Sequence, residues 1–241
     1  MVTGAGSGIG RAVAERLMGA GWHVSLVGRR IDALNATAAT HPGQATVLPG
    51  DVGVPAEIER VFAAHEAAYG RIDLLFNNAG RGAPAVPLDE LAVTAFLDTV
   101  AVNLVGSVLC ARAAFGLMRR QLPGGGRIIN NGSISAYAPR PHSVPYTTTK
   151  HAITGLTRCL ALDGRPYGIM AGQIDIGNAA TELTDRMAAG VLQADGRLVP
   201  EPRMDVSHAA DAVLHMASLP PGANVLFMTV MAASMPFVGR G

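Results

Sequence analysis

Short apolar runs alternate with longer stretches of helical period along most of the chain. Six runs are rich in Val, Ile and Leu without strict polar alternation, which is typical of strands buried on both faces: 24–27, 45–48, 72–76, 127–130, 168–174 and 225–230. Between them, apolar residues recur at helical spacing, as at Ile9, Val13 and Leu17. The alternation of strands and helices predicts a three-layer α/β/α fold with a doubly wound parallel sheet, in one domain over residues 1–241.

Two segments depart from this alternation. Residues 177–196 predict a mobile helical insertion that would cover a substrate site, and residues 231–241 form a tail rich in Met, Pro and Gly. The first strand is also unusual, because only Met1 and Val2 precede a glycine-rich loop. Either residues are missing upstream or this strand is short.

Composition excludes several classes of protein. Of the 241 residues, 49% are apolar and 15% are charged, which excludes a disordered chain and supplies a large core. The 19 Lys and Arg against 18 Asp and Glu give a net charge of +1. We therefore expect no nucleic-acid partner and no basic membrane-binding surface, and we predict no metal site.

The cysteines and the apolar runs indicate the compartment. Cys110 and Cys159 each lie in an apolar helical stretch, so we expect two buried free thiols, which fits a reducing cytoplasm. The N-terminus lacks the pattern of a secretory signal. The longest apolar stretch, 97–118, is interrupted by charged and amide residues, so we expect no membrane span.

A glycine-rich loop opens the first predicted helix. It reads Thr3-Gly4-Ala5-Gly6-Ser7-Gly8-Ile9-Gly10. Gly4 permits a tight turn, Gly8 lets the backbone approach a pyrophosphate, and Gly10 lets the helix pack closely on the sheet. The unpaired N–H groups that follow, from Ser7 to Gly10, suit an anion. Between a strand and an amphipathic helix, this loop predicts a Rossmann-type dinucleotide site.

The end of the second predicted strand bears on the choice of cofactor. A carboxylate there would bind the ribose 2′-hydroxyl of NAD, but the chain has Gly28 followed by Arg29 and Arg30. Cations are disfavoured at the start of a helix, so their placement indicates a bound anion, and the 2′-phosphate of NADP is the natural candidate. The alternative is a pair of solvated surface arginines, with NAD as the cofactor.

Two further strand ends supply candidate cofactor contacts. Asp51 and Val52 follow the third strand, where the carboxylate would either accept from the adenine amino group or cap a turn. Asn78, Ala79 and Gly80 follow the fourth strand, where small residues let the chain pass against the cofactor ribose.

The candidate chemistry lies in Tyr146 and Lys150, which are four residues apart and so share one helix face. An unperturbed tyrosine has a pKa of ~10, and a neighbouring ammonium lowers that pKa by favouring the phenolate. Ser133 precedes the tyrosine by 13 residues and follows a strand, where its hydroxyl could hold a carbonyl oxygen while Tyr146 donates a proton. Ser135 is the rival, and the spacing favours Ser133.

These motifs together resemble those of the short-chain dehydrogenase/reductase family, in its single-domain branch, over about residues 2–230. The resemblance implies that Ser133 polarises the carbonyl, Tyr146 is the general acid/base, and Lys150 lowers its pKa and holds the nicotinamide ribose. Asn103 would position a water molecule in a proton relay. Family likeness also implies that the helices containing 100–118 and 152–162 pair across a two-fold axis, so we expect a homotetramer, with a dimer as the alternative.

The chain departs from the family in the sixth strand and in its tail. The family usually shows Pro-Gly and then, four residues after the glycine, a Thr that binds the nicotinamide carboxamide. Here Ala171-Gly172 occupies the expected place and Ile176 has no hydroxyl, so we expect the backbone at Ile174 to hold the carboxamide.

The leading hypothesis is an NADP(H)-dependent oxidoreductase that moves hydride between nicotinamide and a carbonyl or secondary alcohol. The alternatives are a catalytically silent NADP(H)-binding sensor or scaffold, and an epimerase or dehydratase of the same family. Epimerases usually carry a C-terminal substrate domain, for which 241 residues leave no room.

Overall fold

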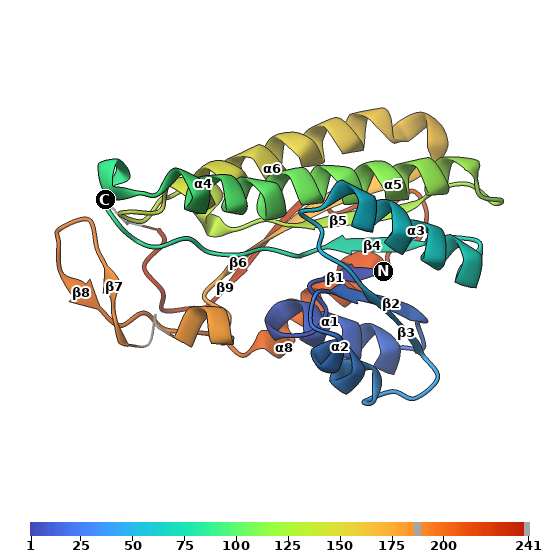
Figure 1. Ribbon diagram of the computed structural model, residues 1–241, viewed down its shortest axis with the longest axis horizontal. Coiled ribbons are helices and arrows are strands. Elements are labelled where there is room, and N and C mark those ends of the chain that lie inside the picture. Colours follow the sequence, from blue (N-terminus) through green and yellow to red (C-terminus); the bar gives the residue numbers. More distant parts are fainter. Residues whose placement is uncertain (186–188, 239–241) are drawn as a thin grey trace.

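A seven-stranded parallel sheet forms the centre of the molecule (Figure 1). This computed structural model describes residues 1–185 and 189–238. The strand order is β3-β2-β1-β4-β5-β6-β9 and every pairing is parallel, as the apolar runs predict. The strands are β1 (Val2–Thr3), β2 (Val24–Gly28), β3 (Ala45–Pro49), β4 (Leu74–Asn77), β5 (Gly126–Asn131), β6 (Ile169–Gly177) and β9 (Phe227–Met231).

Helices cover both faces of the sheet (Figure 1). One face carries α1 (Gly8–Gly19), α2 (Ile31–Ala38) and α8 (Val206–Ala217); the other carries α3 (Pro55–Tyr69), α4 (Val93–Val100), α5 (Ser107–Arg120) and α6 (Val144–Asp163). Between α4 and α5 the helix continues as a π-helical turn, Ala101–Gly106. Short 3₁₀ turns lie at Leu88–Glu90, Ile134–Ala136, Arg165–Tyr167 and Glu182–Thr184.

Each face has its own apolar core. Leu17, Leu26 and Val213 pack between the sheet and the layer of α1 and α8, while Phe62 and Leu117 pack under α3 and α5. The three-layer fold predicted from the sequence is confirmed. The carboxyl ends of β1 and β4, which lie side by side in the sheet, lead to the glycine loop and to Asn78.

The prediction of two buried thiols is right for one cysteine and wrong for the other. Cys110 is buried under the sheet, and burial raises the pKa of its thiol to about 12. Cys159 is exposed. The inner side of α6 buries Ile153 and Thr157, one helical turn apart, and Cys159 lies 200° around the helix from Thr157 at ~100° per residue.

The described part of the segment 177–196 is helical only in part. It holds the 3₁₀ turn Glu182–Thr184, helical backbone at Asp185 and Ala189, and the strand β7 (Val191–Leu192), which pairs antiparallel with β8 (Leu198–Val199). The turn of this ribbon contains Asp195-Gly196, with Gly196 at φ +83°, a sequence typical of tight hairpins. Residues 186–188 lie outside the described residues.

The continuous helix Val93–Arg120 meets the length and composition of a membrane span. It has 28 residues, a mean hydropathy of 1.8 in its most apolar window, and 28% of that window is buried. The polar residues Asp98, Asn103 and Arg112 therefore do not exclude a membrane span by the criteria of length and composition. Asn77 Nδ2 of β4 donates to the Ser107 carbonyl (2.7 Å), so this helix is hydrogen-bonded to the sheet. The absence of a membrane partner stays a prediction.

The described part of the tail packs on the rest of the same chain. Ala232 and Met235 are buried and contact Ile134, and the Phe237 ring lies edge-on to Tyr137 with centroids 6.4 Å apart. Residues 239–241 of the predicted tail lie outside the described residues. The tail thus supports the loop that follows β5.

Candidate active site

The glycine loop leaves the sheet between β1 and β4, where the chain connections diverge to opposite sides. Gly4 has φ +67°, which a side chain would strain. A Cβ on Gly10 would lie 2.1 Å from the Gly4 carbonyl oxygen, so only glycine lets α1 begin this close to the loop. The Asn78 side chain ties the loop to β4 by donating from Nδ2 to the Thr3 carbonyl (2.9 Å).

A groove of about 540 Å³ runs from this loop across the carboxyl ends of the strands. The predicted cofactor residues that line it are Gly4, Ser7, Gly8, Ile9, Gly10, Arg29, Arg30, Asp51, Val52, Asn78, Ala79, Gly80, Tyr146 and Lys150. Ser7 is the N-cap of α1, and its side chain makes no capping hydrogen bond. The N–H groups at the start of α1 are thus free of a side-chain cap inside the groove, which suits a phosphate.

The far end of the groove is basic. Arg29 and Arg30 both line it and both are exposed, with no carboxylate at Gly28. Arg29 Nη1 lies 3.7 Å from Asp51 Oδ2, and its side chain is 69% exposed, so this ion pair is loose. Asp51 Oδ1 accepts from the Gly53 backbone N–H (2.8 Å), which makes Asp51 a turn cap as well as a groove residue.

Tyr146 and Lys150 lie one turn apart near the start of α6. Tyr146 is half-buried, and Lys150 is buried at 5% exposure. Lys150 Nζ donates to the Asn131 carbonyl (2.7 Å) and lies 5.5 Å from the centre of the Tyr146 ring. The ammonium is therefore fixed beside the tyrosine by the end of β5.

Asn103 lies in the π-helical turn and is almost fully buried. Its side chain accepts from the Arg81 backbone N–H (2.8 Å) and donates to the Arg81 carbonyl (2.9 Å) and, at 3.4 Å, to Thr149 Oγ1. These hydrogen bonds connect the loop that follows β4 to α6, next to Lys150. A π-helical turn within an α-helix often marks a functional site, and here it places Asn103 among the site elements.

Ser133 follows β5, and a buried carboxylate holds its backbone. The Asp175 side chain, which is fully buried in β6, accepts from the Ser133 N–H (2.8 Å), from Gln173 Nε2 (2.7 Å) and from the Tyr137 hydroxyl (2.9 Å). Burial raises the pKa of Asp175, against the lowering effect of these hydrogen bonds. Gly132 is required here, since its Cβ would lie 2.0 Å from Asp175 Oδ1.

The two candidate serines are hydrogen-bonded to each other. Ser133 Oγ accepts from the Ser135 backbone N–H (3.1 Å), so the proton of the Ser133 hydroxyl stays available to a substrate oxygen. Both hydroxyl-bearing residues line a second cavity of about 570 Å³. This cavity meets the cofactor groove along Tyr146, Asn131 and Thr181, which line both.

Ile174 is the predicted cofactor residue that the structure does not bring to the groove. It is fully buried inside β6, and its carbonyl accepts from the Gly132 N–H (2.8 Å) within the sheet. The reason is that β6 does not end at Gly172, which pairs with Ile129, but continues to Gly177.

The residue four positions after Gly177 is Thr181, and it lines the groove opposite the glycine loop, 3.2 Å from where a Gly8 Cβ would lie. The same spacing, counted from Gly177 instead of Gly172, finds this threonine in the sequence. The sequence marks Arg140 as a loop residue that could bind an acidic group, but it shows neither the pairing of Arg140 with Glu201 nor the contact of Asp175 with Ser133.

A doubly wound parallel sheet with a glycine loop at its switch point defines a dinucleotide-binding α/β protein. Residues 1–191 match the family model of the short chain dehydrogenases. A 3beta-hydroxysteroid dehydrogenase of Mediterraneibacter gnavus is 33% identical over 194 residues, which cover 79% of this chain and 69% of that protein. The short-chain reductase NovJ of Streptomyces niveus is 40% identical over 195 residues, which cover 78% and 71%.

A solved structure of actinorhodin polyketide ketoreductase with NADPH superposes with a TM-score of 0.82 at 28% identity, covering 95% of this chain and 94% of that one. The chain therefore belongs to the short-chain dehydrogenase family, a family of oxidoreductases.

Proposed function

We propose that the protein is an NADP(H)-dependent oxidoreductase that interconverts a carbonyl compound and a secondary alcohol. The observation that carries the proposal is the meeting of two cavities at Tyr146, one lined by the glycine loop and the other by Ser133. The two relatives named above are a dehydrogenase and a reductase, which supports the same reaction class. The tyrosine, lysine and serine are all present, which is the pattern of an active enzyme.

The residues at this meeting point divide the chemistry. A bound nicotinamide would supply or accept the hydride. Ser133 Oγ, whose acceptor side is engaged by the Ser135 N–H, would donate a hydrogen bond to the substrate oxygen. Tyr146 would pass its hydroxyl proton to that oxygen in reduction and take it back in oxidation. The fixed ammonium of Lys150 favours the phenolate, and Asn103 holds the surrounding loop and helix in place.

The groove fits a phosphorylated dinucleotide by its donor set. The uncapped start of α1 would receive the pyrophosphate, and Thr181, on the opposite side of the groove, would face the nicotinamide end. Arg29 and Arg30 at the basic end would bind the 2′-phosphate of NADP(H), and the absence of a carboxylate at Gly28 removes the partner that NAD needs.

The change Tyr146→Phe tests the catalytic assignment. It removes the transferable proton and keeps the ring, so turnover should fall by ~10²–10⁴-fold, the usual contribution of general acid catalysis. NADPH binding, followed by cofactor fluorescence, should stay within about twofold. NADPH oxidation would be assayed over a panel of ketones, quinones and oxoacyl thioesters. A variant that keeps more than half of the wild-type turnover would contradict the role of Tyr146.

Cofactor choice is tested by the double change Gly28→Asp with Arg29→Ile. A hydrogen bond to a charged group contributes ~1.5–3 kcal/mol, so one arginine would give NADPH roughly a 10- to 150-fold preference over NADH. The double change supplies a ribose carboxylate and should reverse the preference. A Cβ on Gly28 would lie 3.3 Å from the end of the Leu34 side chain, a tight contact that requires this side chain to shift by a few tenths of an ångström. A parent protein whose kcat/KM is higher with NADH would show that the arginines are surface residues.

A further inference from the structure

Arg140 lies in the wall of the second cavity, in the loop between Ser135 and α6. Its side chain is 16% exposed. Among the described residues that line this cavity, Arg140 is the one with a permanently charged side chain. In an enzyme pocket, an arginine with free guanidinium donors would select a carboxylate or phosphate on the substrate.

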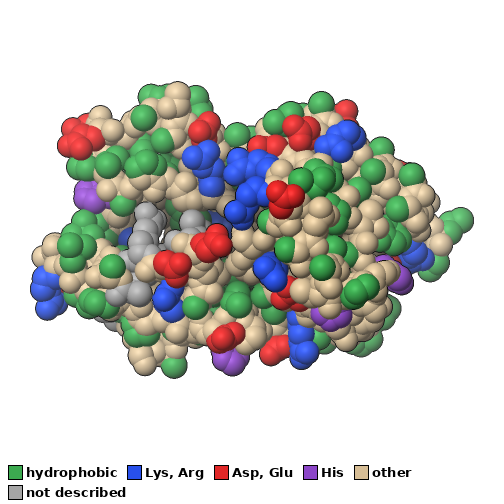
Figure 2. All heavy atoms as spheres, turned by 60° about the horizontal axis from the view of Figure 1, so that its bottom comes forward, with side chains coloured by type: hydrophobic (Ala, Val, Ile, Leu, Met, Phe, Trp, Pro, Cys, Tyr) green, Lys and Arg blue, Asp and Glu red, His purple; other side chains and the backbone are tan. Residues whose placement is uncertain are grey.

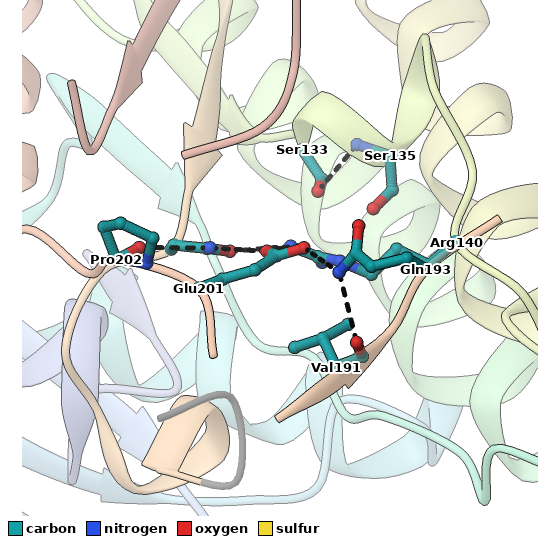
Figure 3. A network of polar contacts seen from close by, with 8 residues as sticks. Ser133, Ser135, Arg140, Val191, Gln193, Glu201 and Pro202 are labelled. Carbon is teal, nitrogen blue, oxygen red and sulfur yellow. Dashed lines mark hydrogen bonds and ion pairs between the residues drawn. The ribbon is translucent and has the colours of Figure 1, made fainter. Parts of the chain in front are cut away.

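Here the charge of the guanidinium is balanced through one nitrogen, Nη2, while the buried Nε has no hydrogen-bond partner among the described residues. Arg140 Nη2 donates to Glu201 Oε2 and to Asn178 Oδ1 (2.8 Å for the latter), as the close view in Figure 3 shows for the carboxylate. The Glu201 side chain is fully buried, at 0% exposure. A buried carboxylate in contact with the arginine cancels its charge at the cavity wall.

Glu201 is itself held from two further sides. Its Oε2 accepts from Asn178 Nδ2 (2.8 Å) and its Oε1 from Gln193 Nε2 (3.1 Å), and Gln193 in turn donates to the Val191 carbonyl of β7 (Figure 3). Burial alone would raise the pKa of Glu201, but the hydrogen bonds from Arg140, Asn178 and Gln193 bring it below its usual value. The carboxylate is therefore a fixed anion behind the cavity wall.

The rest of the wall is mostly apolar. Ile134 and Ile176 line the inner side, Pro141 lines the loop, and Val191, Leu192 and Leu198 of the ribbon close the outer side. A cavity of about 570 Å³ has the size of a site for a drug-sized molecule. An anionic substrate would have to face Glu201 or displace it from Arg140, and removing one partner of a buried ion pair is costly.

We infer that the second cavity takes uncharged, mostly apolar carbonyl or alcohol substrates, and that Glu201, by neutralising Arg140, is the residue that rejects anionic ones. The inference rests on the proposed function and specifies the substrate class of the same site. It assigns Glu201 a role in specificity although it makes no contact with the reacting atoms.

The test uses pairs of ketones that differ in one charge, such as methyl 4-acetylbenzoate and 4-acetylbenzoate, at pH 7 with saturating NADPH. For the wild-type enzyme, kcat/KM should be at least tenfold higher with the neutral member. In Glu201→Gln the charge of Arg140 is no longer balanced, so the ratio should fall at least tenfold. The double change Arg140→Gln with Glu201→Gln removes both charges and should restore the neutral preference.

A matched control is Glu66→Gln, which breaks the exposed Arg120–Glu66 pair (2.6 Å) outside both cavities and should leave the ratio unchanged. A wild-type preference for the anionic ketone, or an unchanged ratio in Glu201→Gln, would overturn the inference. If no ketone is reduced, the proposed function fails separately. In that case, calorimetry measures the binding of the same ketone pairs to the NADPH-loaded protein. A preference for the neutral ketone that is lost in Glu201→Gln supports the inference, and equal binding of the two ketones by the wild-type protein overturns it.

Discussion

Asp175 connects three parts of the site through one carboxylate. It accepts from the N–H of Ser133, from Gln173 and from Tyr137, whose ring contacts Phe237 of the tail. Because this carboxylate is fully buried, the Ser133 N–H would lose its hydrogen-bond partner if it were removed, whereas Gln173 Nε2 also donates to Thr154 Oγ1 (3.1 Å). A buried unsatisfied donor costs ~1–3 kcal/mol, so the loop would shift to recover its hydrogen bonds. We expect the position of the Ser133 hydroxyl to depend on Asp175.

The change Asp175→Ala should lower kcat at least tenfold while the KM for NADPH changes by less than about threefold, because the cofactor groove does not include this residue. Asp175→Asn keeps an oxygen acceptor for the Ser133 N–H and should retain more activity than the alanine variant. Steady-state kinetics of both variants, with circular dichroism to verify folding, make the measurement. Equal activity of the alanine variant and the wild type would show that Ser133 is held by other contacts.

At the scale of elements, the sequence predicts local structure well and distant pairings poorly. The start of α1 follows from the glycine loop, and the shared face of Tyr146 and Lys150 follows from helical spacing. The end of β6 was predicted too early, because an apolar run does not show where Asn178 takes φ +50° and ends the strand. No local pattern reveals a partner like that of Arg140, 61 residues away in Glu201.

His65 clamps α3 to its neighbours and makes folding stability depend on pH. Its Nε2 contacts the Arg71 carbonyl (3.0 Å), so this nitrogen carries the proton, and Nδ1 accepts from the Ser25 hydroxyl (2.8 Å) on β2. Burial lowers the pKa of His65 from 6.5 to about 4. Between these values the unfolded chain binds more protons, so stability falls as the pH falls.

From these pKa values, the free energy of unfolding should decrease by about 2 kcal/mol between pH 7 and pH 5 on account of His65. Urea unfolding of His65→Gln should therefore show a smaller decrease than the wild type, although its stability at pH 7 is lower. The exposed His215→Gln is the control and should keep the wild-type slope. An equal slope in His65→Gln would contradict the clamp.

At the scale of the whole molecule, charged side chains of both signs are mixed on the surface, whereas large exposed apolar side chains lie along the helices of one layer. Lys, Arg, Asp and Glu side chains are interspersed on the face drawn in Figure 2, in keeping with the net charge of +1. Apolar side chains, in contrast, stand exposed along the helices on the other side of the sheet: Val93 at 71%, Leu97 at 55%, Val108 at 38% and Leu162 at 60%. We propose that a second copy of the chain covers them and that the enzyme works in the cytoplasm.

The assembly prediction follows from this surface. From the family likeness we predict a tetramer at micromolar concentration, with a dimer as the smaller alternative. The exposed apolar residues on α5 and α6 fit one of the two self-complementary interfaces that a tetramer with two-fold symmetry needs, and this interface alone would give the dimer. Replacing Val108 and Leu162 by lysine places charges in that interface and should reduce the mass to that of a dimer or monomer. Ile31→Lys is the matched control, because this residue is 51% exposed on α2, across the sheet, and should leave the mass unchanged. Multi-angle light scattering measures the mass of all three proteins. A monomeric mass of the wild type would refute the assembly, because no second copy of the chain would then cover the exposed helices.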